Sequence, residues 1–165
     1  MVKYSAKFFK AHPDAVVPEM KSAEAAGYDL CCVDDFSLYP GEMRVVDTGL
    51  VIQPPPGYHF EVLVRSGLAY KHNIMLANNV GLIDRDYAGA TDTVKLMLYR
   101  APQYCLRDDI DGNPFLGLES TGPIEFKKGD RVAQLVFRET HRFSFEELPT
   151  APADAKRGGL GSTGV

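Results

Sequence analysis

Short runs of β-branched and aromatic residues alternate with glycine and proline along the chain, a pattern typical of many short strands joined by turns. The clearest run places Val94, Leu96 and Leu98 on one face and Lys95 on the other, as a half-buried strand requires. Comparable patterns predict strands over residues 28–33, 44–52, 58–65, 93–100, 131–137 and 142–145. This succession predicts an all-β fold, either a sandwich, a jelly roll or a barrel.

Helical periodicity is scarce. Residues 21–26 are the best helical candidate, but they span fewer than two turns, so a loop is the alternative. Residues 66–72 fit a short turn of helix. Residues 101–124 are rich in turn-forming and acidic side chains, which predicts a surface excursion inserted between two strands. The end of the sequence is rich in alanine, proline and glycine, so we expect a core over 1–151 and a mobile arm over 152–165.

Composition narrows the possible functions. A length of 165 residues, 45% of them hydrophobic, suits one globular domain. The net charge of -4 argues against a protein that holds nucleic acid through its phosphates, so a polyanionic ligand would need locally placed cations. Cys31, Cys32 and Cys105 lack zinc-site spacing and predict free thiols in a reducing compartment. The sequence shows neither a membrane span nor a signal peptide, and we expect a cytoplasmic location.

Two segments combine a predicted strand end with reactive or charged groups. Arg65, Ser66 and Gly67 supply a cation, a hydroxyl and a glycine before the predicted helical turn, which suits an anion. An ordinary turn with a surface arginine is the alternative. The apolar run 80–83 ends at Asp84, at the tip of a plausible hairpin. A carboxylate held there can accept a proton from a water molecule that attacks phosphorus, although Asp84 can also serve simply as a turn residue.

Three further segments carry polar groups in unusual places. Gln134 shares a predicted strand face with Val132 and Val136, so its amide needs either a core partner or a ligand. Asp29 begins a strand, where a capped turn and a metal-linked site are both possible. The glycines of 158–164 lie among hydroxyls and follow Lys156 and Arg157, a combination that suits a phosphate chain or, alternatively, a disordered polar tail.

Five fragments occur in a fixed order between residues 26 and 164: AGYDL, RSGLA, GLIDRDYAG, GDRVAQLV and GGLGSTG. This ordered set resembles the five motifs of the trimeric dUTPase family. The resemblance implies a distorted jelly-roll, barrel-like subunit in a homotrimer with shared active sites. It also implies Mg2+-dependent hydrolysis of dUTP to dUMP and pyrophosphate.

The resemblance assigns roles to individual residues. Asp84 would activate the water that attacks the α-phosphate, and Tyr87 would pack under the deoxyribose and exclude a 2′-hydroxyl. The uracil would be bound by Asn78 and by the backbone of Gly81, Leu82 and Ile83. The phosphates would be bound by Arg65, Ser66, Gly67 and Gln134, while Asp29 would act on magnesium through water.

The C-terminal arm would close over the substrate through Arg157, or Lys156, together with Leu160, Gly161 and Ser162. Leu160 stands where the family commonly has an aromatic residue, and the segment 101–124 is longer than the family pattern. A dCTP deaminase or a bifunctional deaminase/dUTPase is the alternative within the superfamily, although no glutamate lies near GLIDRDYAG to act as a deaminating base. Another alternative is a dUTPase-like protein with an added partner-binding role.

Overall fold

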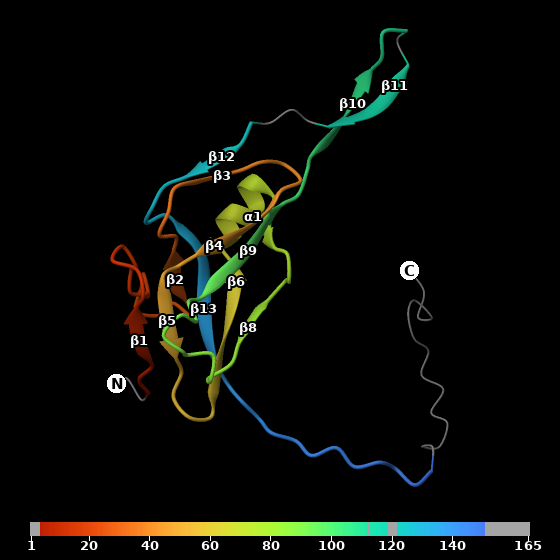
Figure 1. Cartoon of the computed structure of the whole chain (residues 1–165). Coiled ribbons are helices and arrows are strands. Elements are labelled where there is room, and N and C mark those ends of the chain that lie inside the picture. Colours follow the sequence, from red (N-terminus) through yellow and green to blue (C-terminus); the bar gives the residue numbers. More distant parts are fainter. Residues whose placement is uncertain (1–3, 112, 119–121, 151–165) are drawn as a thin grey trace.

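The computed structural model describes residues 4–111, 113–118 and 122–150, which form a body of short strands with one projecting hairpin and an extended C-terminal segment (Figure 1). The helix is α1 (Ser66–His72). The strands are β1 (Lys7–Lys10), β2 (Tyr28–Cys31), β3 (Phe36–Leu38), β4 (Met43–Asp47), β5 (Leu50–Gln53), β6 (Tyr58–Val64), β7 (Ile74–Leu76), β8 (Gly81–Ile83), β9 (Lys95–Arg100), β10 (Tyr104–Asp108), β11 (Pro114–Leu118), β12 (Ile124–Phe126) and β13 (Arg131–Glu139).

Two sheets enclose the core. One has the order β2-β13-β6-β8 and the other the order β4-β9-β7, with antiparallel neighbours in both. The smaller antiparallel pairs are β1-β5, β12-β3 and β10-β11. Buried side chains from both larger sheets, among them Phe60, Leu135, Leu96 and Leu98, form one apolar cluster. The predicted all-β class is confirmed, and Val94, Leu96 and Leu98 are buried while Lys95 is exposed, as the alternation predicts.

The predicted strands 28–33, 58–65, 93–100 and 131–137 are confirmed with small shifts of their ends, as is the helical turn at 66–72. The prediction for 142–145 is wrong, because these residues leave the body without pairing to another described strand (Figure 1). The helical interpretation of 21–26 is also wrong, since this segment is a turn in which the Ala25 N–H donates to the Ser22 carbonyl at 3.2 Å.

The single strand predicted over 44–52 is two strands, β4 and β5, which belong to different sheets. The chain turns at Thr48 and Gly49, where Gly49 has a φ of +63° and its N–H donates to Asp47 Oδ1 at 2.7 Å. Thr48 is fully buried, and its hydroxyl donates to the Val94 carbonyl at 2.8 Å. Asp47 and Gly49 are turn-forming residues within this run, but the turn is buried and its polar groups are satisfied inside the core, so one strand was predicted across it.

Replacing Gly49 with alanine is expected to lower the free energy of unfolding by about 2–4 kcal/mol, because backbone strain adds to crowding. An added Cβ would lie 2.6 Å from His12 Cβ and 2.9 Å from Val33 Cγ1. Urea denaturation at one fixed protein concentration measures the change. Gly41→Ala is the matched control, since Gly41 has a φ of +82° but no atom within 4 Å of the added Cβ. That control is expected to cost about 1 kcal/mol, and equal losses would rule out crowding at Gly49.

Between β9 and β12, strands β10 and β11 pair only with each other among the described strands and project from the body (Figure 1). Arg100, at the end of β9, holds the base of this hairpin. Its buried guanidinium donates from Nη1 to the Leu38 carbonyl at 3.2 Å and to the Gly122 carbonyl at 2.7 Å. The points where the chain leaves and re-enters the body are therefore tied to one side chain.

Candidate active site

A groove of about 530 Å³ lies on the outer side of the sheet formed by β2, β13 and β6. The strand register places Asp29 beside Gln134 and Gln134 beside Leu63, so three strands contribute neighbouring side chains. The end of β6 adds Arg65, and the start of α1 adds Ser66 and Gly67. The complete lining is Lys21, Ala25, Ala26, Gly27, Asp29, Leu63, Arg65, Ser66, Gly67, Arg131, Gln134, Val136 and Arg138.

The centre of the groove is an ion-pair network around Asp29. Its side chain is only 13% exposed, with Arg65 Nε 3.2 Å from Oδ1 and Arg131 Nη1 3.0 Å from Oδ2. Arg65 Nη1 also donates to the Arg131 carbonyl at 3.2 Å. Asp29 therefore holds two guanidinium groups in place. Because a guanidinium carries five N–H donors, both arginines retain donors for a second anion.

Positive charge dominates the groove although the whole chain is acidic. Arg65, Arg131, Arg138 and Lys21 line it, whereas Asp29 is the one carboxylate in its described lining. Arg138 Nε donates to Glu61 at 3.0 Å, and Lys21 Nζ lies 3.5 Å from Glu19. Burial, followed by the Asp29 charge, raises the pKa of the neighbouring Cys31 thiol, so Cys31 is a neutral core side chain. A basic groove of this kind suits phosphate groups.

Gln134 faces the groove because of a β-bulge. The register of β13 against β2 shifts between Arg131 and Ala133, and as a result Val132 and Ala133 are both buried in the core. The prediction that Gln134 shares a face with Val132 is therefore wrong, whereas Val136 does line the groove with Gln134. Space beside the amide depends on Gly27, where an added Cβ would lie 3.2 Å from the Leu135 carbonyl oxygen and 3.6 Å from Gln134 Oε1.

Asp84 is not among the residues that line the groove. Strand β8 pairs with β6 so that Ile83 faces Phe60 and Gly81 faces Val62. Asp84 therefore continues toward the Tyr58 end of β6, while Arg65 follows the opposite end. At a rise of about 3.3 Å per residue the two ends of β6 are roughly 20 Å apart. One chain thus holds the groove and Asp84 at separate places.

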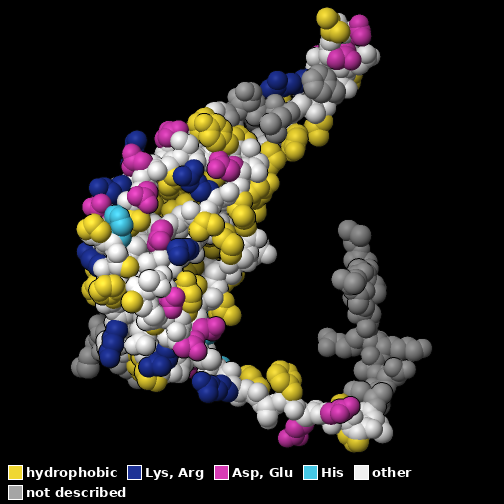
Figure 2. Space-filling model, viewed as in Figure 1, with side chains coloured by type: hydrophobic (Ala, Val, Ile, Leu, Met, Phe, Trp, Pro, Cys, Tyr) yellow, Lys and Arg dark blue, Asp and Glu magenta, His cyan; other side chains and the backbone are white. Residues whose placement is uncertain are grey.

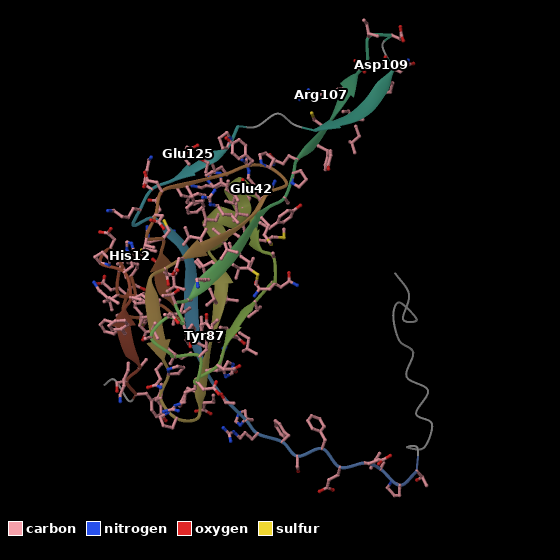
Figure 3. The ribbon with its side chains drawn as sticks, in the orientation of Figure 1. His12, Glu42, Tyr87, Arg107, Asp109 and Glu125 are labelled. Carbon is pink, nitrogen blue, oxygen red and sulfur yellow. The ribbon has the colours of Figure 1, made fainter. Side chains whose placement is uncertain are left out.

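The segment after β8 is not a hairpin tip, contrary to prediction. Strand β9 follows it but belongs to the other sheet, so β8 and β9 do not pair. Instead, turns form the connection, with the Tyr87 N–H donating to the Asp84 carbonyl at 3.3 Å. The Tyr87 hydroxyl donates to the Thr93 carbonyl at 3.4 Å, and its side chain is 40% exposed. Figure 3 shows Tyr87 at the end of the body away from α1, which Figure 1 draws in the same orientation.

The other residues assigned to the nucleoside surround β8. Asn78 is exposed in the turn before this strand, where its carbonyl accepts the Val80 N–H at 2.7 Å. Gly81 is buried, Ile83 packs against the core and Leu82 is 62% exposed. The arm residues Lys156, Arg157, Leu160, Gly161 and Ser162 lie outside the described part of the chain.

Three residues that line the groove were not predicted as site residues from the sequence: Lys21, Arg131 and Arg138. Arg138 follows Gln134 by four positions on the same strand, so the two-residue period could have revealed it. Arg131 immediately precedes the bulge, and the sequence contains no signal for that bulge. Lys21 belongs to a turn rather than to a periodic element, and only the folded chain brings it to the groove.

A second cavity, of about 570 Å³, is a poorer candidate for phosphate chemistry. Its lining is mostly apolar and includes Tyr4, Phe8, Tyr28, Tyr58 and Phe137. Lys7 is the single charged side chain among the described residues that line it. The groove around Asp29, rather than this cavity, is therefore the candidate active site.

Comparison with known proteins identifies the family of this chain. The sequence profile of the dUTPase family matches residues 14–103. Deoxyuridine 5′-triphosphate nucleotidohydrolase of Wolinella succinogenes is 36% identical over 163 residues, covering 98% of this chain and 95% of that protein. The enzyme of the same name from Nautilia profundicola is 34% identical, with coverage of 96% and 97%.

Solved structures show the same fold. A mutant dUTPase of Staphylococcus bacteriophage 80alpha with dUpNHpp has a TM-score of 0.74 and 25% identity, covering 98% of this chain and 99% of that one. A mutant dUTPase from phage phi11, described as coordinating a structural Mg(II) ion, has a TM-score of 0.71 and 22% identity, with coverage of 90% and 99%. The chain belongs to the dUTPase family.

Proposed function

We propose that this protein is a dUTP diphosphatase, which hydrolyses dUTP to dUMP and pyrophosphate. The observation that carries the proposal is the convergence of Asp29, Arg65 and Gln134 on one basic groove. These residues come from three fragments that are far apart in the sequence and that resemble dUTPase motifs. The relatives that match nearly the whole chain are named for this reaction. In a cell the activity would lower dUTP and supply dUMP for dTMP synthesis.

In the proposed mechanism, Arg65, the first turn of α1 and Gln134 bind the phosphate chain. The first N–H groups of α1, which include those of Ser66 and Gly67, have no carbonyl partner within the helix and can therefore donate to phosphate oxygens. Asn78 and the backbone of β8 bind uracil, and Tyr87 packs against the deoxyribose. A base other than uracil would leave polar groups of this pocket unpaired, which lowers kcat/KM for its nucleotide.

The Asp84 carboxylate performs the chemical step. It accepts a proton from water as the water oxygen forms a bond with the α-phosphorus. The bond between the α-phosphorus and the oxygen that bridges to the β-phosphorus breaks, and pyrophosphate leaves with that bridging oxygen. Arg65 and Gln134 hold the departing phosphates, whose negative charge increases as the bond breaks.

Magnesium fits this groove only as an ion that arrives with the phosphates. The described residues contain no group of three or more His, Cys, Asp or Glu side chains that could hold a metal. Asp29 already accepts two arginine contacts, which leaves its remaining lone pairs for water-mediated contact. Mg2+ commonly keeps several waters and binds substrate phosphates, and it would neutralise phosphate charge here.

The separation of Asp84 from the groove supports a homotrimer in which neighbouring subunits complete each site. A second observation favours association: the β4-β9-β7 sheet exposes large apolar side chains on its outer face. Met43, Val45, Met75 and Met97 are 54%, 56%, 43% and 37% exposed. Figure 2 shows hydrophobic side chains gathered along the body below the hairpin. Covering such a patch with another subunit removes apolar area from water.

We place the enzyme in the cytoplasm because Cys31, Cys32 and Cys105 are free thiols, as is usual in a reducing compartment. No helix in the described ranges has the length and apolar character of a membrane span.

Pyrophosphate release from dUTP, dCTP, dTTP and UTP, each assayed with and without magnesium, tests the proposed function. We expect rapid magnesium-dependent release from dUTP and at least about 10²-fold lower kcat/KM for each of the other nucleotides. Ammonia release from dCTP, followed in parallel, would instead identify the deaminase. Similar turnover of dUTP and UTP would contradict the proposed role of Tyr87.

A further inference from the structure

We propose that Lys21 is an additional phosphate-binding residue of the groove. It contacts the β- or γ-phosphate of the bound nucleotide. This inference rests on the proposed function and extends its phosphate site to a residue outside the fragments that resemble the family motifs. Lys21 lines the same groove as Arg65 and Gln134.

The fold holds the Lys21 turn against the centre of the groove. An isolated β-bridge joins Glu19 to Asp29, and the Asp29 N–H donates to the Glu19 carbonyl at 3.2 Å. Lys21 follows two residues later, and the Ser22–Ala25 turn returns the chain to Ala26 and Gly27, which also line the groove. The position of the lysine is thus tied to the carboxylate that organises Arg65 and Arg131.

Lys21 differs from the three arginines in how firmly it is held. Arg65 and Arg131 contact the mostly buried Asp29, and Arg138 is hydrogen-bonded to Glu61. Lys21 contacts Glu19 at 3.5 Å, and the two side chains are 56% and 71% exposed. An exposed pair of this kind contributes little, so the ammonium can leave Glu19 for a bound anion at small cost.

The electrostatic setting favours a ligand with several charges. The Lys21 charge acts on Cys31 together with those of Arg131 and Arg65, all lowering the thiol pKa against the larger effect of burial. The lysine therefore lies within electrostatic range of the arginine pair. An ammonium attracts a triphosphate more strongly than a monophosphate, because the attraction grows with the charge of the ligand.

Calorimetric titration of Lys21→Ala with dUMP and with dUpNHpp tests this proposal. We expect dUpNHpp affinity to fall roughly 5- to 20-fold while dUMP affinity changes less than about 2-fold. For dUTP, KM should rise with kcat nearly unchanged, because the contact is present in both the ground state and the transition state. Lys21→Arg should restore most of the affinity for dUpNHpp. Lys10→Ala is the matched control and should bind as wild type, because Lys10 lies on the exposed strand β1 and does not line the groove.

Unchanged dUpNHpp affinity, or equal losses for dUMP and dUpNHpp, would overturn the inference. Inorganic tripolyphosphate separates this failure from a failure of the proposed function. If tripolyphosphate bound the wild type more tightly than Lys21→Ala but the wild type did not hydrolyse dUTP, the phosphate site would be supported and the proposed activity would be refuted. If the wild type hydrolysed dUTP but Lys21→Ala bound dUpNHpp with normal affinity, the proposed activity would stand and the role of Lys21 would be refuted.

Discussion

Replacing Asp84 with asparagine is expected to lower kcat for dUTP by about 10²- to 10⁴-fold, the usual contribution of a general base. The amide has nearly the shape of the carboxylate but cannot accept the proton of the attacking water. Because the Asp84 side chain is exposed, the folded structure should persist. Steady-state pyrophosphate release measures kcat, and calorimetric titration with dUpNHpp should give an affinity close to that of the wild type.

Asp86→Asn is the matched control for this experiment. Asp86 lies in the same turn segment, is also exposed and carries the same charge, but has no assigned role in catalysis. It should retain nearly all of the wild-type rate. If Asp84→Asn turned over dUTP at a comparable rate, the general base would have to be another group.

The sequence predicts the core of the fold well wherever one face of a strand is buried. Leu96 and Leu98 alternate with exposed residues in β9, so the two-residue period reports burial directly. The period fails where backbone geometry changes, as at the bulge that buries both Val132 and Ala133. It fails again at Gly49, where a buried turn separates two apolar segments that were predicted as one strand. Both errors concern the position of a turn or a register shift, which local alternation does not encode.

The candidate site is predictable in its parts but not in its assembly. Asp29, Arg65 and Gln134 are conspicuous in the sequence as polar groups at strand ends or on a strand face. Their meeting depends on the pairing of β13 with both β2 and β6, which is a long-range property of the sheet. The two contacts from Arg65 and Arg131 to Asp29 likewise appear only once the strands are paired.

The separation of Asp84 from the groove gives the strongest test of a shared site. Arg65→Ala and Asp84→Asn should each be nearly inactive, the first through lost phosphate binding and the second through the lost base. Trimers that contain both variants should recover about a third of the wild-type activity. In each such trimer, about one site in three joins the intact groove of an Asp84→Asn subunit to the intact Asp84 of an Arg65→Ala subunit. Coexpression with two different tags, followed by tandem purification and pyrophosphate assay, measures this recovery.

The same experiment with the double variant Arg65→Ala/Asp84→Asn in place of Arg65→Ala is the matched control. No subunit in that mixture has an intact Asp84, so no site can be completed and activity should stay at the level of the parents. If the first mixture also stayed at that level although mixed trimers had formed, each site would have to lie within one chain. Asp84 would then have to move roughly 20 Å along β6 to reach the groove. The pairing of Ile83 in β8 with Phe60 in β6 opposes such a movement. Recovery in the mixture therefore distinguishes a site completed by a neighbouring subunit from one that requires β8 to leave its sheet.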